Sequence, residues 1–199
     1  MQSDRDMLWA RLCLGLDGGL LPEHCIAMLI VDLETRLLHA FGDRFACAIG
    51  RTGGISAALK REGDGATPVG RWPVLGALLR PDRVRPPRTA LPWRWLRPDD
   101  GWSDTPADPC YNRPVRHPHR CSAERLWRDD HAYDIVIVLG HNQSPVVPGA
   151  GSAIFWHVSQ PDFRATEGCV AIARDALLSL LPKLSPGMPL EVGAGPAKP

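Results

Sequence analysis

The sequence predicts a mainly β fold, a sandwich-like domain with a few short helices. Glycine and proline account for 39 of the 199 residues, 19 and 20 respectively, against a usual combined share of roughly one in eight. This composition disfavours a helix bundle and favours short strands joined by many turns. Apolar residues make up 44% and charged residues 23% of the chain, so the chain can bury a core and disorder is excluded. The length is that of one domain.

The first residues of the chain are predicted to form a helical extension over residues 1–24. Apolar side chains recur at helical spacing between Met7 and Leu16, and the Gly18-Gly19 pair is a typical helix end. The start of the chain lacks the basic residues and apolar run of a secretory signal. We therefore expect a cytoplasmic protein, an export signal outside this chain, or another export route.

Short apolar runs bounded by turn residues predict the strands of the domain. Gly42-Asp43 is a hairpin signal between two of them. Residues 63–70 are too rich in glycine and proline for a regular element and predict an ordered turn. Residues 174–181 have the apolar spacing of a helix with Asp175 in its first turn, and 194–199 form a polar tail. The expected strands lie at residues 25–32, 35–41, 45–50, 71–79, 134–139, 152–158 and 190–192.

Residues 80–128 form a long insertion of different character. Proline is frequent there, and Trp93, Trp95, Trp102 and Trp127 supply much of the aromatic content of the chain. A stretch of this length without strong periodicity is typical of a binding loop or lid, and its aromatic residues argue against disorder. We expect this insertion to act as a lid.

The charge balance and hydropathy exclude two classes of partner. Lysine plus arginine number 23 and aspartate plus glutamate 22, so there is no positive field to bind nucleic acid. No apolar run approaches the roughly 20 residues of a membrane span. We expect a monomer that binds neither nucleic acid nor the membrane.

The cysteines predict no familiar metal or redox motif. The chain has six cysteines and no C-x-x-C pair, which excludes a zinc ribbon or thioredoxin-like site. Cys110, His117, His119 and Cys121 offer four soft ligands, but their spacing fits no common zinc template. The alternatives to a metal site are a disulfide between Cys110 and Cys121, or free thiols at both positions. We expect no metal and no cofactor.

The strongest local motif is Thr166-Glu167-Gly168-Cys169, which precedes an apolar segment. A glycine before a cysteine leaves the backbone open, so the N–H groups of Gly168 and Cys169 can face a substrate carbonyl. His157 lies twelve residues earlier, at the end of an expected strand, and is the candidate base for the thiol. The alternative is a buried structural cysteine beside an unrelated histidine.

These residues resemble the active-site signature of the L,D-transpeptidase (YkuD-like) catalytic domain family. The matches are His157, Thr166, Gly168 and Cys169, and a second match is the turn Gly65-Ala66-Thr67-Pro68-Val69-Gly70-Arg71-Trp72. The resemblance covers most of the chain and implies a YkuD-like β-sandwich with a catalytic domain over residues 25–193. Three departures point to a divergent branch: Glu167 stands where the family has histidine, Ala171 stands where it has arginine, and the interval from His157 to Cys169 is shorter than the family's common spacing.

The resemblance implies a cysteine-dependent acyltransferase that cross-links peptidoglycan in the periplasm or cell envelope. Cys169 would attack a stem-peptide carbonyl and form a thioester, His157 would take the thiol proton, and an amine of a second stem peptide would resolve the thioester. The links would join third-position residues or first- and third-position residues. The alternatives are a thiol amidase or carboxypeptidase, and a non-catalytic peptidoglycan-binding module.

The remaining candidate residues are those expected to bind substrate. Thr166 and Glu167 flank the cysteine, and arginine side chains suit carboxylate groups of a peptide because the guanidinium binds them in bidentate fashion. The alternative for the insertion residues is a loop held to the body by Arg–Asp pairs and tryptophan packing. The candidates in the insertion and just after it are Tyr111, Asn112, Arg113, Trp127, Arg128 and His131.

Overall fold

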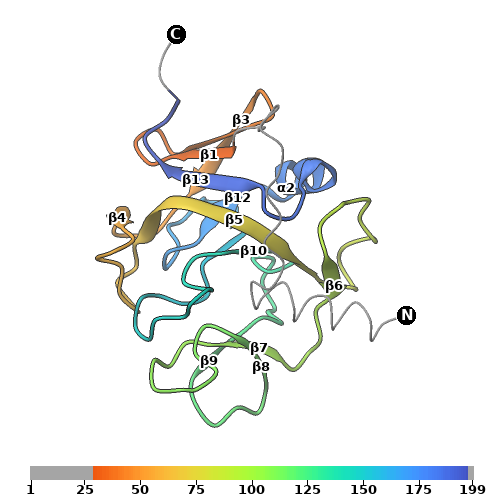
Figure 1. The fold of residues 1–199 in the computed structure, drawn as a ribbon. Helices are drawn as coiled ribbons and strands as arrows, with labels where there is room; N and C mark the ends of the chain where they lie inside the picture. Colours follow the sequence, from red (N-terminus) through yellow and green to blue (C-terminus); the bar gives the residue numbers. More distant parts are fainter. Residues whose placement is uncertain (1–28, 197–199) are drawn as a thin grey trace.

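Short strands make up most of the regular structure in the computed structural model, which describes residues 29–196 (Figure 1). The helical extension predicted at residues 1–24 lies outside the described residues. The strands are β1 (Leu29–Asp32), β2 (Leu37–Ala40), β3 (Asp43–Ala48), β4 (Gly54–Ser56), β5 (Thr67–Leu79), β6 (Trp93–Trp95), β7 (Asp100–Ser103), β8 (Pro114–Arg116), β9 (Ala123–Arg125), β10 (Ile135–Leu139), β11 (Phe155–Val158), β12 (Val170–Ile172) and β13 (Pro189–Gly193).

Eight of these strands form a closed hydrogen-bonded circuit. Their order is β10-β11-β12-β3-β2-β1-β13-β5, and β5 pairs back to β10. The 13-residue strand β5 closes the circuit because its residues 70–73 pair with β13 and its residues 74–79 with β10. Two of the pairings, β1–β13 and β11–β12, are parallel. The predicted mainly β, sandwich-like fold is therefore confirmed, with one short α-helix in the described residues.

Strand β10 shows how the domain builds two cores. Ile135, Ile137 and Leu139 belong to the core inside the circuit, whereas Val136 and Val138 belong to a second apolar cluster on the outer face. Alternate residues of a strand point to opposite faces, so a strand covered on both sides reads as a continuous apolar run. Because β10 is covered on both faces, its residues form the continuous apolar run from which the sequence predicted a buried strand.

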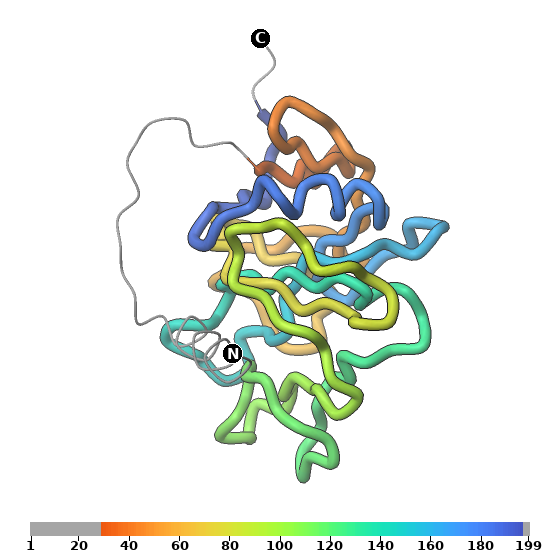
Figure 2. Tube along the Cα trace, turned by 90° about the vertical axis from the view of Figure 1, so that its right-hand side faces the viewer, coloured from red at the N-terminus to blue at the C-terminus, as the bar shows by residue number. Residues whose placement is uncertain are grey.

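The insertion supplies the cover for the outer face. It contains β6, which pairs with β5, and a small sheet of order β8-β7-β9, which lies below β5 and β10 in Figure 1. Trp102 of β7 is fully buried against Phe155 of β11, with the ring centroids 5.1 Å apart and the rings perpendicular. Figure 2 shows the same segment, in green, extending away from the strands of the circuit.

Two predicted elements can be compared closely with the structure. The helix predicted at 174–181 is confirmed as α2 (Arg174–Leu180), followed by a 3-10 turn, η1 (Leu181–Lys183), and it buries Leu177 and Leu180. The turn predicted over residues 63–70 is wrong in its second half, because β5 already begins at Thr67. The short strand β4 pairs in parallel with Thr67–Val69, and this pairing partner is not visible in the local composition. Among the described residues, no helix is long and apolar enough to cross a membrane.

Candidate active site

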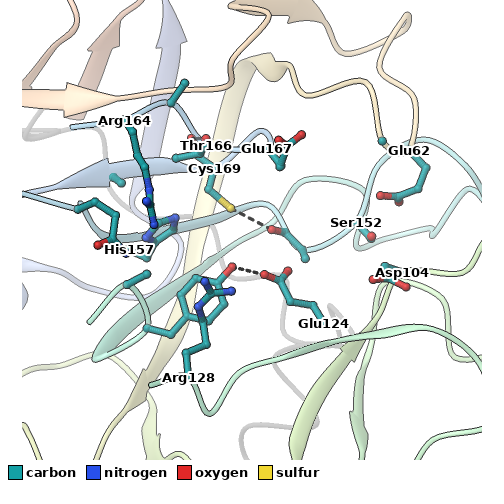
Figure 3. Close-up of a pocket in the computed structure, with 17 residues that line it drawn as sticks. Glu62, Asp104, Glu124, Arg128, Ser152, His157, Arg164, Thr166, Glu167 and Cys169 are labelled. Atoms are coloured by element: carbon teal, nitrogen blue, oxygen red, sulfur yellow. Dashed lines mark hydrogen bonds between the residues drawn. The ribbon is translucent and has the colours of Figure 1, made fainter. Parts of the chain in front are cut away.

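A cavity of about 460 Å³ opens between the outer face of β11 and β12 and the insertion (Figure 3). Its walls come from the ends of β11 and β12, from the loop over residues 160–167, and from insertion segments that include Asp104 and Glu124. Cys169 and His157 both line it, as do Thr166, Glu167 and Arg128. The structure therefore brings five of the predicted site residues to one cavity.

The register of two parallel strands places Cys169 and His157 on the same face. Trp156 pairs with Val170, and both side chains are buried inside the circuit. Because side chains alternate along each strand, the preceding and following residues face outward. Cys169 thus lies next to Phe155, and its Sγ accepts a hydrogen bond from the Phe155 N–H at 3.4 Å.

Burial keeps the Cys169 thiol in its neutral form. The side chain is 8% exposed, and Sγ donates a hydrogen bond to the carbonyl oxygen of Ala153 at 3.2 Å. Desolvation, assisted by the negative charge of Glu124, raises the pKa of Cys169 to about 12. The resting side chain at neutral pH is therefore a thiol and not a thiolate.

The His157 imidazole is neutral as well. Its Nδ1 lies 2.9 Å from the carbonyl oxygen of Val158, which assigns the ring proton to Nδ1 and leaves Nε2 as the basic nitrogen. The ring stacks edge-on against Tyr133, with the centroids 5.1 Å apart. Burial lowers the pKa of His157 to about 4, and the positive charge of Arg128 acts in the same direction. A neutral imidazole is therefore available as a base from weakly acidic pH upward.

Hydrogen bonds of Thr166 shape the turn that precedes Cys169. The Thr166 hydroxyl donates to the Cys169 carbonyl oxygen at 2.6 Å and accepts the Gly168 N–H at 3.2 Å. The Gly168 N–H, which the sequence analysis expected to face a substrate carbonyl, is thus bonded within the turn in this structure. Thr166 lines the cavity, but its hydroxyl is engaged by the protein itself.

The two sequence motifs that carry the resemblance meet at Gly168. This residue has φ of 134°, and a Cβ placed on it would lie 2.9 Å from the carbonyl oxygen of Ala66. Gly50 connects the same two segments, since it bridges to Thr166 and its N–H donates to the Thr67 hydroxyl at 2.8 Å. Only glycine accommodates both the left-handed backbone and the close approach of Ala66.

Polar side chains surround Cys169 in the cavity. In Figure 3, His157 and Arg164 lie on one side of Cys169, Glu62, Ser152 and Asp104 lie on the other, and Arg128 lies beside Glu124. Glu167 is 76% exposed at the cavity mouth, where its Oε2 lies 2.9 Å from Arg51 Nε.

Arg128 and Glu124 lie beside Tyr133 at the base of the cavity. Arg128 forms a bidentate pair with Asp130, at 2.9 and 2.7 Å, and its guanidinium lies 5.1 Å from the centroid of the Tyr133 ring. The Tyr133 hydroxyl donates to Glu124, and burial raises the pKa of that carboxyl group.

Five predicted groove residues lie outside the cavity and contact other parts of the protein. The Tyr111 hydroxyl donates to Glu62, Arg113 donates to Gln143, the Arg80 guanidinium lies 3.9 Å over the Trp127 ring, and His131 lies 2.9 Å from Asp134. The fifth, Asn112, is fully buried. These contacts agree with the alternative in which pairing and packing hold the insertion to the body.

Asn112 connects the insertion to the segment beneath Cys169. Its Oδ1 accepts the Trp102 indole N–H at 2.9 Å and the Ala153 N–H at 3.1 Å, and its amide donates to the Asn142 carbonyl at 2.6 Å. Ala153 in turn accepts the Cys169 thiol. Asn112 is therefore a positioning residue candidate, two hydrogen bonds away from the sulfur.

The sequence analysis did not select several residues of the cavity. Tyr133, Glu124, Arg164 and Ser152 all line it, but no spacing rule relates them to Cys169 in the sequence. Their positions depend on how the insertion and the 160–167 loop fold over β11. Among the described residues, the side chains close enough to share a metal ion lie in the insertion and not in this cavity.

Comparison with known proteins identifies the same part of the chain. The family model described as the L,D-transpeptidase catalytic domain, YkuD, matches residues 27–192. No curated protein matches the sequence. Among solved structures, L,D-transpeptidase 1 of Mycobacterium tuberculosis is similar with 9% identity and a TM-score of 0.39, over 84% of this chain and 61% of that one. This chain thus spans less than two thirds of that protein's length.

Replacing Gly168 tests the requirement for glycine in the turn. Gly168→Ala should lower the free energy of unfolding by about 1–3 kcal/mol, because the new Cβ meets Ala66 and the backbone is left-handed. Gly193→Ala is the control, since a Cβ there has no atom within 4 Å. Urea unfolding of both variants measures the difference, and equal losses would contradict the proposed close packing.

The depressed pKa of His157 predicts a loss of stability in acid. Below its ordinary pKa of 6.5 the unfolded chain takes up a proton that the folded chain takes up only near pH 4. Stability should therefore be complete above pH 6.5 and fall by up to about 1.4 kcal/mol per pH unit toward pH 4. Urea titrations of wild type and His157→Gln between pH 7 and pH 4 isolate this contribution. Identical pH slopes in the two proteins would show that His157 is not buried neutral.

Proposed function

Since this chain belongs to the YkuD family of L,D-transpeptidase catalytic domains, we propose that it cross-links peptidoglycan through a thioester on Cys169. The family implies an L,D-transpeptidase-type peptidoglycan enzyme. The observation that supports Cys169 and His157 as the reacting pair is their placement on neighbouring parallel strands, facing one cavity. The stem peptides of the cell wall are the substrates, and the cell envelope is the corresponding location.

The reaction begins with a proton transfer from sulfur to imidazole. As the Cys169 thiol proton passes to His157 Nε2, Sγ bonds to the carbonyl carbon that precedes a D-residue of the donor peptide. The C–N bond then breaks, and the leaving amine takes the proton from the imidazolium. The product of this half-reaction is a thioester between Cys169 and the donor peptide.

Transfer to the second peptide reverses these roles. An amine of the acceptor attacks the thioester carbonyl, its proton passes to His157, and the Cys169 thiol reforms with the new amide bond. The N–H of Cys169 is the donor proposed for the oxyanion, because the Gly168 N–H is bonded to Thr166. No metal or cofactor takes part in these proposed reaction steps.

The neutral resting pair favours activation by substrate. A thiol with a pKa of about 12 and an imidazole with a pKa of about 4 do not form a stable ion pair before substrate binds. Proton transfer is therefore coupled to carbon–sulfur bond formation, when the negative charge moves onto the carbonyl oxygen. This arrangement limits unproductive reactions of a free thiolate.

The charged residues of the cavity suggest which groups bind the two peptides. Arg164 and Arg128 suit the carboxylate groups of the donor, whereas Glu62, Asp104 and Glu124 suit the ammonium group of the acceptor. Ser152 also lines this part of the cavity, with its Oγ buried near the Tyr111 phenol. A polar group of the acceptor could bond to this hydroxyl.

Replacement of the cysteine tests the proposed chemistry. Cys169→Ser should abolish the formation of muropeptide dimers, because a serine hydroxyl is a far weaker nucleophile beside a neutral imidazole. Cys110→Ser is the matched control, since Cys110 is an exposed free thiol outside the cavity. Mass spectrometry of purified muropeptides after incubation measures the products and reads out which positions are linked.

The same experiment separates the alternatives. Dimers that persist with Cys169→Ser would refute the thioester. Trimmed monomers without dimers from the wild type would identify a thiol hydrolase, and failure of a carbapenem to acylate Cys169 would favour a binding module.

Replacing Glu124 tests the acceptor side of the cavity. Glu124→Gln should raise the acceptor concentration needed for half-maximal dimer formation about tenfold, equivalent to ~1.4 kcal/mol, because the carboxylate charge is lost. The rate of acylation by donor alone should not fall, because loss of the Glu124 charge removes one of the influences that raise the pKa of Cys169. Glu191→Gln, which removes an exposed surface carboxylate paired with Arg71, is the control. Equal effects on donor acylation and on acceptor use would assign Glu124 a structural role instead.

A further inference from the structure

A cluster of three different donor groups lies in the insertion, apart from the cavity. Asp108 follows β7, whereas His119 and Cys121 lie between β8 and β9. The carboxylate oxygen, ring nitrogen and sulfur of these residues all lie within 4.8 Å of one another. We propose that they form a zinc site that joins the two loops of the insertion.

The donor set matches zinc better than other common ions. Zinc accepts carboxylate oxygen, imidazole nitrogen and thiolate sulfur in one tetrahedral site, whereas calcium and magnesium require oxygen donors. Asp108 Oδ2 and His119 Nε2 lie 2.6 Å apart, at hydrogen-bond distance. Zinc would replace the proton between them, and the Cys121 thiol would release its proton on binding. Water would complete the fourth position.

Hydrogen bonds from neighbouring groups orient the Asp108 carboxylate. Asp108 is 4% exposed, its Oδ2 accepts the Ser103 hydroxyl at 2.6 Å, and its Oδ1 accepts the Cys110 N–H at 3.0 Å. These hydrogen bonds fix the orientation of the carboxylate group. Such outer contacts orient a ligand and are typical of metal sites.

The structure changes the ligand set that the sequence offered. Cys110, His117, His119 and Cys121 fit no zinc template by spacing. Folding places His119 and Cys121 with Asp108 instead, while Cys110 is exposed and outside the cluster. A buried aspartate brought in from the neighbouring loop is a ligand that local spacing does not reveal.

Zinc at this position would stiffen the segment that builds one wall of the cavity. It would join the loop after β7, where Asn112 lies, to the loop that precedes β9, and β9 is the strand that contains Glu124. Asn112 bonds to Ala153, the residue that accepts the Cys169 thiol. A metal at this position would add a cross-link between the two loops of the insertion.

Metal binding by the full chain tests the proposal directly. Protein freed of metal with a chelator and kept reduced should bind one zinc ion per chain and melt at a higher temperature with zinc. Cobalt(II) in place of zinc should give the visible bands of a tetrahedral site and a near-ultraviolet thiolate-to-cobalt band. No uptake of zinc, or cobalt bands without the thiolate transition, would overturn the site.

Two variants identify the ligands. Cys121→Ser should abolish the thiolate-to-cobalt band and weaken zinc binding about tenfold or more, whereas Cys110→Ser should retain the band and the affinity of the wild type. Loss of both with Cys110→Ser would overturn the assignment. A Cys110–Cys121 disulfide found by peptide mapping of protein isolated without reductant would also overturn it. If Cys121→Ser folds poorly, the presence or absence of the thiolate-to-cobalt band in the wild-type protein still decides whether a cysteine binds the metal.

Discussion

The parallel pairing of β11 with β12 is the constraint on which the candidate site depends. The register pairs Trp156 with Val170, and both side chains point into the circuit. Their chain neighbours His157 and Cys169 therefore point outward, to the same cavity. A shift of one residue in either strand would send one of these side chains into the core. The closed circuit resists such a shift, because β12 is also paired with β3 and β11 with β10.

The insertion determines the chemistry of these two side chains. Without it, the outer face of β10 and β11 would be in water, and Val136, Val138 and Phe155 would be exposed. By packing Trp102 and Leu126 on that face, the insertion removes water from around Cys169 and His157 and moves their pKa values apart. The same segment contributes Glu124 and Asp104 to the cavity. One packing interface therefore sets the reactivity of the pair and the charge around it.

The elements best predicted from sequence are those in which local pattern and tertiary environment agree. The apolar run of β10, the hairpin at Gly42 and the spacing of Leu177 all match the structure. The start of β5 at Thr67 was not predicted, because the backbone hydrogen bonds that make it a strand come from β4. A pairing partner elsewhere in the chain overrides the turn preference of glycine and proline.

The sequence by itself determined the fold class and the residues of the Gly168-Cys169 turn, since strand periodicity, glycine geometry and a two-part motif are local properties. Only the tertiary structure decided which polar residues surround the sulfur. Arg164, Glu124 and Ser152 line the cavity, whereas Asn112 and Trp127 pack elsewhere. The physical reason is that the position of a side chain in the insertion depends on how β7, β8 and β9 pair and how they dock on β11. These contacts join residues far apart in the chain, and no spacing in the sequence encodes them.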